Sequence, residues 1–270
     1  MILSNPHTHT RYCDGKNTPA DMAREAFQRG FISLGFSEHA PQPIDPAWGM
    51  ADEAGYQAEV RGLQREYAGR MKIWLGVEFE RLAECDLSKY DYVVAASHYV
   101  DLPGGMIAVD GRLDKLLDAL SDHFRGDGVA MAAAYYGAAA EFAAAIRPAI
   151  WAHFDLIKKH NVGGALFDAA SAGYRRAALQ ALEKVRASGA ALEVNTGGMA
   201  RGYMDEPYPD LFLLQAWREM GGEVIVGSDC HFAPHLEFGF DAAIALIKRA
   251  GYDGAVRLGG GDALLERFSL

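Results

Sequence analysis

The sequence feature that most constrains the fold is one unit that recurs along the chain. A short apolar run ends at a histidine, glutamate, aspartate or asparagine, and a segment with helical spacing follows. The seven apolar runs are 2–3, 31–36, 72–77, 90–96, 149–152, 190–194 and 223–226. Near-continuous apolar runs are typical of parallel strands buried on both faces. The chain is therefore expected to alternate strands with helices.

The segments between these runs show helical patterns. Apolar residues fall on one face over 56–67, 174–185 and 240–247. Thr18, Pro19 and Asp21 form a helix start signal with a capping box. The alanine-rich stretch 129–146 has a single charge and is expected to be a helix covered by another element, with a homodimer interface as the alternative.

Seven strand–helix units favour a closed α/β barrel over an open doubly wound sheet, because no glycine-rich phosphate fingerprint follows the first run. We expect a single barrel domain spanning 1–270, close to the ~250 residues typical of such barrels. In a barrel the carboxyl ends of the strands converge on one mouth. The ionisable residues that end the apolar runs should therefore meet there.

Composition excludes several classes of protein. Acidic residues outnumber basic ones, 36 against 26, which argues against affinity for a nucleic-acid backbone and suits a site that gathers cations. No run approaches the ~20 apolar residues of a membrane span, and the first residues do not form a signal peptide. Three scattered cysteines do not make a disulfide framework, so a cytoplasmic location is expected.

Nine side chains at or near the ends of these runs are candidate metal ligands. His7 and His9 are two apart, so in a strand both point to the same side. Glu78 follows an apolar run, where a carboxylate shared by two cations would not be left unpaired. The full set is His7, His9, Asp14, His39, Glu78, His98, His153, Asp229 and His231.

Nine donors are too many for one ion with four to six ligands and suggest two or three ions. Mixed imidazole and carboxylate donors suit Zn, Mn, Fe or Co better than Ca or Mg. Taken singly, each of these residues has an ordinary explanation as a hydrogen-bonded core residue. Their repeated placement after successive apolar runs is what favours a metal centre.

Nearby carboxylates are given other roles. Glu38 is expected to orient a histidine ligand, and Asp155 to orient His153. Glu80 and Arg81 are expected to lie on the surface.

Seven short motifs contain these residues. They are H-T-H at 7–9, S-E-H at 37–39, G-V-E at 76–78, S-H-Y at 97–99, H-F-D at 153–155, E-V-N-T at 193–196 and G-S-D-C-H at 227–231. In this order they resemble the PHP (polymerase and histidinol phosphatase) superfamily, and most of all its branch of stand-alone histidinol-phosphate phosphatases. As a set they are highly specific and span nearly the whole chain.

The resemblance implies a distorted, TIM-like (βα)7 barrel with a trinuclear centre of divalent metals such as Zn, Mn or Fe. It assigns His7, His9, Glu78 and Asp229 to one ion, Glu78, His98 and His153 to a second, and Asp14, His39 and His231 to a third. Asp14 stands where many relatives have histidine, which leaves the identity of the third metal open.

The resemblance also implies a phosphatase that hydrolyses a small phosphate monoester. The expected reaction converts L-histidinol phosphate to L-histidinol and inorganic phosphate in histidine biosynthesis. We hypothesise that a metal-bridging hydroxide beside Glu78 attacks phosphorus and that Asp229 or a metal-bound water protonates the leaving alkoxide. The third ion, with Arg201 or Lys159, is expected to neutralise phosphoryl charge. Lys159, His160 and Arg201 loosely match basic residues that hold the phosphate.

Three other functions stay open. A related phosphoesterase would act on a nucleotide or a nucleic-acid end, although the chain has no basic, aromatic stripe for long nucleic acid. An amidohydrolase-like barrel also uses an H-x-H motif, but such sites often bridge their metals through a modified lysine where Glu78 stands here. A non-enzymatic, metal-stabilised module should have lost ligands, and none of the nine is missing.

Overall fold

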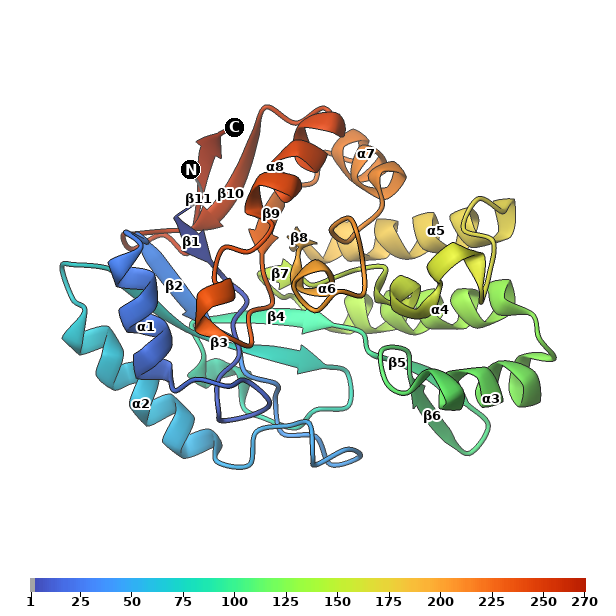
Figure 1. The fold of residues 1–270 in the computed structure, drawn as a ribbon, viewed down its shortest axis with the longest axis horizontal. Coiled ribbons are helices and arrows are strands. Elements are labelled where there is room, and N and C mark those ends of the chain that lie inside the picture. The colour runs from blue at the N-terminus through green and yellow to red at the C-terminus, as the bar shows by residue number, and fades with distance from the viewer. Residues whose placement is uncertain (1–2) are drawn as a thin grey trace.

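Seven parallel strands form the ligand-bearing sheet, and six of them overlap a predicted apolar run, whereas β1 lies just after the first run (Figure 1). The computed structural model describes residues 3–270, so Ile2 of the first run lies outside the described residues. The strands are β1 (Ser4–Asn5), β2 (Ser33–Phe36), β3 (Lys72–Glu80), β4 (Tyr92–Ala96), β7 (Ile150–Trp151), β8 (Ala191–Asn195) and β9 (Val224–Gly227). They pair in that order, each parallel to the next.

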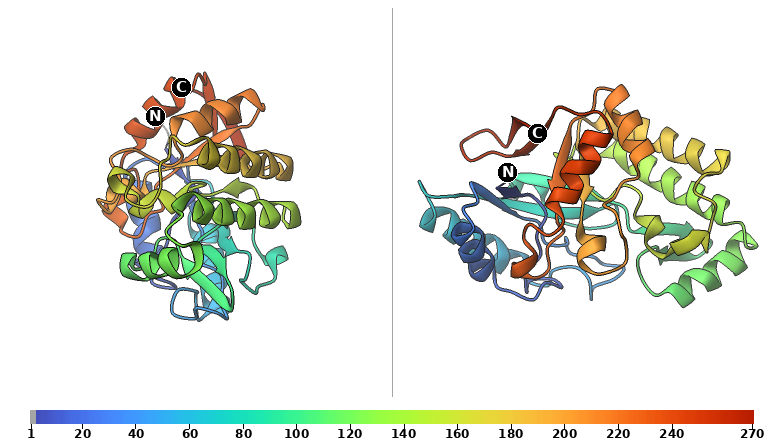
Figure 2. Two further views of the ribbon diagram at one scale, coloured as in Figure 1. Left: turned by 90° about the vertical axis from the view of Figure 1, so that its right-hand side faces the viewer. Right: turned by 45° about the horizontal axis from the view of Figure 1, so that its top comes forward.

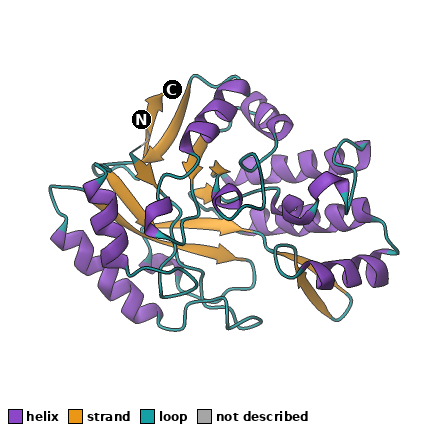
Figure 3. Ribbon diagram, viewed as in Figure 1, coloured by secondary structure: helices purple, strands orange, loops and turns teal. Residues whose placement is uncertain are grey.

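Helices surround the sheet, as the colouring by secondary structure makes plain (Figure 3). They are α1 (Pro19–Gln28), α2 (Glu53–Glu66), α3 (Leu113–Phe124), α4 (Gly128–Ala145), α5 (Ala172–Ser188), α6 (Gly197–Ala200), α7 (Leu211–Glu219) and α8 (Phe240–Arg249). The predicted start of α1 is confirmed, because Thr18 and Asp21 form a reciprocal capping box with Pro19 in the first turn. Within residues 3–270, no helix is long and apolar enough to cross a membrane.

The alanine-rich helix α4 is covered by other helices, as predicted. It lies between α3 and α5 in both Figure 1 and Figure 2. Tyr135 and Tyr136 are fully buried on it, and Tyr136 Oη lies 2.9 Å from Tyr174 Oη of α5. The homodimer remains a prediction.

The two edges of the seven-stranded sheet meet only just beyond β1 and β9. There His9 N donates to Cys230 O at 2.8 Å, and Cys230 N donates to His7 O at 3.0 Å. At the amino end of β2, β10 (Gly254–Leu258) lies between the two edges. It pairs with β9, and its Leu258 O accepts a hydrogen bond from Ser33 Oγ of β2 at 2.7 Å. An added strand between the edges distorts the barrel while leaving its carboxyl-end mouth intact.

Two strand pairs lie outside the predicted pattern. The antiparallel strand β11 (Leu265–Ser269) follows β10, and β5 (Tyr99–Leu102) forms a hairpin with β6 (Gly105–Ala108). The hairpin turn contains Pro103 and Gly104, a dipeptide that marks turns. Apolar side chains of β3, β4, β7, β8, β9 and β10 form one cluster within the sheet, so the polar ligands lie above a packed floor.

Candidate metal centre and active site

The structure brings all nine predicted ligands together at the carboxyl ends of the strands. Groups of their donor atoms lie within 4.8 Å of one another, close enough to hold metal ions. His7 and His9 follow β1, His39 follows β2, Glu78 lies in β3, His98 follows β4, His153 follows β7, Asp229 and His231 follow β9, and Asp14 lies in the loop before α1. Six of the seven apolar runs thus deliver a ligand to one mouth, and the run of β8 delivers none.

The first group gathers around one oxygen of Glu78. Glu78 Oε2 lies 3.3 Å from both His7 Nε2 and His9 Nε2, and His9 Nε2 lies 3.2 Å from Asp229 Oδ1. Ligand atoms at ~2.0–2.2 Å from a tetrahedral ion are roughly 3.3–3.6 Å apart, so this spacing suits a shared metal. His7 Nε2 and His9 Nε2 are buried without a hydrogen-bond partner, which a cation would provide, and His39 Nδ1 lies 2.9 Å from Glu78 Oε2.

The second group faces the other oxygen of the same carboxylate. Glu78 Oε1 lies 3.1 Å from His153 Nε2 and 3.5 Å from His98 Nε2. The two oxygens of Glu78 therefore serve separate sets of imidazoles, which is the arrangement that a bridging ligand requires.

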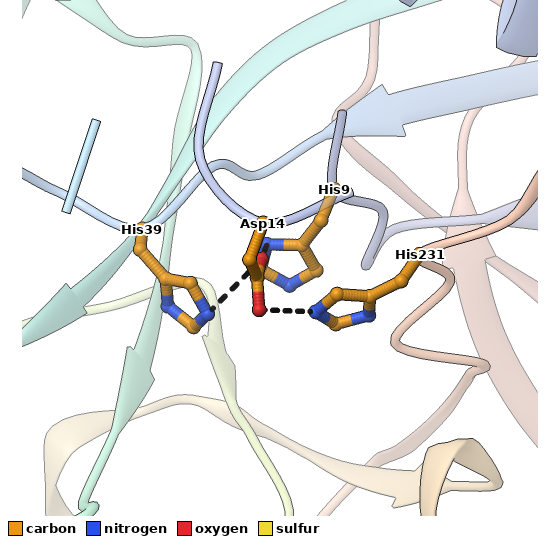
Figure 4. Close-up of side chains that lie close together, drawn as sticks. All are labelled: His9, Asp14, His39 and His231. Carbon is orange, nitrogen blue, oxygen red and sulfur yellow. Dashed lines mark hydrogen bonds and ion pairs between the residues drawn. The ribbon is translucent and has the colours of Figure 1, made fainter. Parts of the chain in front are cut away.

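The third group lies nearer the opening and centres on Asp14 (Figure 4). Asp14 Oδ2 is 3.1 Å from His231 Nε2, and its Oδ1 is 3.8 Å from His39 Nε2. The ring of His9 stacks on that of His231 with centroids 4.3 Å apart, so this group adjoins the first. Asp14 supplies a carboxylate where it was predicted to act as a ligand.

The electrostatics of the centre suit divalent cations. Burial alone would raise the pKa of Glu78, but the imidazoles of His39 and His7 lower it well below its usual value. Burial, together with His231 and His39, lowers the pKa of His9 to about 3. Against the effect of burial, Glu80 and Glu78 raise the pKa of His98 to about 9. An ionised carboxylate and a neutral imidazole are the forms that bind metal, so Glu78 and His9 are ready to bind a cation, whereas His98 must first release a proton.

Glu193 is a positioning residue to which sequence reasoning gave no role. Its Oε1 is 2.8 Å from His7 Nδ1, and its Oε2 accepts from His153 N at 3.1 Å and Asn195 Nδ2 at 2.8 Å. A carboxylate beside Nδ1 keeps the proton there and leaves Nε2 of His7 free for metal. Gly227 is needed beside it, because a Cβ there would lie 1.9 Å from Glu193 Oε1. The E-V-N-T motif was the available signal.

Glu80 is also a positioning residue, and its predicted surface location is wrong. Its side chain is 3% exposed, its Oε2 accepts from His98 N at 2.6 Å, and the same oxygen lies 3.4 Å from His98 Nδ1. Glu78 and Glu80 are two apart on β3 and therefore face the same side, which was the signal that could have identified it. Arg81 lies mostly buried and pairs with Asp101.

Two other carboxylates were predicted to orient histidine ligands. Glu38 Oε2 accepts from Thr10 N at 3.0 Å and from Cys13 Sγ at 2.8 Å, and Cys13 Sγ lies 3.4 Å from His9 Nδ1, so Glu38 reaches a ligand through Cys13 rather than directly. The role predicted for Asp155 is wrong, because Asp155 pairs with Lys158 at 3.2 Å and makes no hydrogen bond with the neighbouring imidazole of His153.

A cavity of about 170 Å³ opens over the ligands. Arg201 lines it, and its Nη2 donates to Asp229 Oδ2 at 2.8 Å. Asp229 has a left-handed backbone with φ of 47°, a conformation that aspartate tolerates better than most residues. Lys159 also lines the cavity, whereas the structure does not bring His160 to it. A larger hollow of about 900 Å³ lies at the amino ends of β2 and β3 and contains none of the nine ligands.

Comparisons with known proteins agree with this geometry. The PHP domain family matches residues 5–197. A Deinococcus radiodurans protein named probable histidinol-phosphatase is 31% identical over 267 residues, covering 92% of this chain and 94% of its own. The Bacillus subtilis histidinol-phosphatase is 24% identical over 272 residues, covering 90% and 98%.

A solved structure shares the architecture. The crystal structure of histidinol phosphate phosphatase from Lactococcus lactis, complexed with Zn, L-histidinol and phosphate, matches with a TM-score of 0.69. It covers 96% of this chain and 98% of its own at 19% identity. This likeness confirms the predicted fold class of a distorted α/β barrel. The single domain over 1–270 stays a prediction.

Proposed function

Because this chain belongs to the PHP domain family, we propose that it is a metal-dependent phosphoric monoester hydrolase that converts L-histidinol phosphate to L-histidinol and inorganic phosphate. The names of its relatives and the ligands bound in the Lactococcus lactis structure support this substrate. The observation that carries the proposal is the position of Glu78, whose two oxygens face two sets of imidazoles. A place in histidine biosynthesis and in the cytoplasm belongs to the same proposal.

Two or three divalent transition metals would be held by the nine residues of the three groups. The residues are His7, His9, Asp14, His39, Glu78, His98, His153, Asp229 and His231. Bound divalent ions lower the pKa of water and neutralise phosphoryl oxygens. The unpartnered imidazole nitrogens at the centre fit such ions, and the donors do not distinguish Zn from Mn or Fe.

Arg201 supplies positive charge from the chain itself. Its guanidinium lines the cavity and is fixed on one side by Asp229, so its remaining N–H groups can donate to phosphate oxygens. Burial alone would raise the pKa of Asp229, but Arg201 and His7 lower it well below its usual value. An ionised Asp229 suits metal holding better than the proton donation hypothesised from the sequence.

Tyr208 offers a neutral donor in the same cavity. Its hydroxyl is buried and has no hydrogen-bond partner in the described part of the chain. Tyr208 lines the same cavity as Arg201, and its hydroxyl is a donor for an oxygen of the ester. An isomorphous Tyr208→Phe variant removes only this donor.

The test pairs metal content with phosphate release. Elemental analysis of the purified protein should find divalent transition metal, and L-histidinol phosphate should be hydrolysed faster than nucleoside monophosphates, glycerol phosphate or oligonucleotide ends. Glu78→Gln should lower both bound metal and phosphate release, the latter by at least about 10²-fold. Glu84→Gln, on an exposed residue near the end of β3, is the matched control. Full activity and full metal content in Glu78→Gln would refute the bridging role.

A further inference from the structure

The cavity has a side recess next to the metal ligands. The recess has a volume of about 20 Å³ and is lined by Gln42, Trp48, Tyr99 and Asp110 together with Glu80 and the ligands His39, Glu78 and His98. Trp48, His98 and Asp110 line both hollows, so the recess adjoins the space above the metal ligands. A substrate whose phosphate lies over the ligands can therefore extend into it.

Asp110 is held by its main chain, and its carboxylate is left unpaired. Lys159 Nζ donates to Asp110 O at 2.6 Å, and His160 Nε2 lies 2.8 Å from Gly111 O. Val109 N donates to His98 O at 2.8 Å, which fixes the segment against the metal centre. Among residues 3–270 the carboxylate oxygens have no hydrogen bond or ion pair. The two basic residues predicted to hold phosphate thus position a carboxylate.

Gln42 presents a second unpaired acceptor to the same recess. Its side chain is 9% exposed, and its Oε1 has no hydrogen-bond partner in the described residues. A buried acceptor without a partner is costly, by about 1–3 kcal/mol, unless a donor arrives with a ligand. Gln42 and Asp110 together require a group that donates several hydrogen bonds and carries positive charge, and an ammonium group does both.

We propose that this recess binds the protonated amino group of the alcohol part of the substrate, so that the enzyme selects phosphate monoesters of amino alcohols. The proposal rests on the proposed phosphatase function. Asp110 pairs with the ammonium group, Gln42 Oε1 accepts a second hydrogen bond, and the half-exposed ring of Trp48 lies alongside. Opposite charges at the two ends of the substrate are then matched by opposite charges in the cavity.

The test compares two esters that differ only in the amino group. They are L-histidinol phosphate and its deamino analogue, imidazolylpropyl phosphate, each assayed with the metal-loaded enzyme. Asp110→Asn should lower kcat/KM for the aminated ester by roughly 10- to 100-fold, mainly through KM, and leave the deamino ester unchanged. Gln42→Met should show the same selectivity with a smaller effect. Asp45→Asn, a nearby carboxylate that lines neither hollow, is the control.

The remaining outcomes distinguish a failure of the recess from a failure of the proposed phosphatase function. An equal loss on both esters would show that Asp110 only supports the metal centre, which overturns the recess. Equal hydrolysis of the two esters by the unaltered enzyme would do the same while leaving the phosphatase function intact. Hydrolysis of neither ester, nor of nitrophenyl phosphate, would overturn the proposed function itself and the recess with it.

Discussion

Replacing Glu193 with glutamine should change which nitrogen of His7 carries the proton. The carboxylate faces one donor through Oε1, at His7, and two donors through Oε2, at His153 N and Asn195 Nδ2. Glutamine keeps only one acceptor oxygen, so its amide nitrogen will take the side with the single donor. His7 must then accept through Nδ1 and carry its proton on Nε2, the atom that faces Glu78.

The expected effect is a loss of metal affinity without a loss of fold. Asn195 cannot compensate by rotating its own amide, because its Oδ1 accepts from Gly197 N at 2.8 Å. Loss of the partner that orients a histidine ligand weakens metal binding by roughly 10- to 100-fold. That range corresponds to about 1.4 to 2.8 kcal/mol of binding free energy. The change should fall on the ion held by His7 rather than on all ions equally.

The measurement is a competition titration of the metal-free protein with zinc and a chromogenic chelator. Circular dichroism should show an unchanged fold in Glu193→Gln. Glu183→Gln, on the exposed side of α5, serves as the matched control and should bind zinc like the unaltered protein. Equal zinc affinity in a folded Glu193→Gln variant would refute the reasoning about the proton on His7.

Two further substitutions separate substrate charge from metal support. Arg201→Lys replaces the planar guanidinium, which can donate two parallel hydrogen bonds, with a single ammonium group. The kcat/KM for the phosphate ester should therefore fall roughly 10- to 100-fold, while elemental analysis should find an unchanged metal content. An unchanged kcat/KM would contradict the contact between Arg201 and phosphate. Glu80→Gln should weaken the ion held through His98 by about 10-fold in the same chelator competition, because the carboxylate beside Nδ1 is lost; unaltered stoichiometry and affinity would show that His98 needs no such partner.

The strands and ligands could be predicted because both signals are local. An apolar run of four to seven residues identifies a buried parallel strand, and the first polar residue after it lies at the mouth. The run 72–77 became β3 with Glu78 at its carboxyl end, as expected. The observed strand continues to Glu80. An unpaired carboxylate would ordinarily end a buried strand, but the carboxylate of Glu80 is paired with the imidazole of His98.

The partner of Glu193 could not be predicted from the apolar runs, because that partner is distant in the sequence. Glu193 contacts His7 across 186 positions, and the contact exists only after β8 and β1 are placed in the same barrel. The β5–β6 hairpin was missed because its strands are only four residues long and pair with each other in antiparallel fashion, outside the repeated strand–helix pattern. Without that hairpin, nothing indicated that Asp110 reaches the cavity.

Charge alone also failed to separate residues that face the substrate from residues that support the loops. Lys159 and His160 are basic and near the mouth, yet each contacts a main-chain carbonyl of the segment that carries Asp110. Arg201 also lines the cavity, but two of its N–H groups already donate to Asp229, one to Oδ2 at 2.8 Å and one to the main-chain oxygen at 3.2 Å. The chain therefore supplies too little free positive charge to balance a phosphate dianion, and bound cations must supply the rest. Phosphate binding then depends mainly on the metals, whereas the choice among phosphate esters depends on the recess beside Asp110.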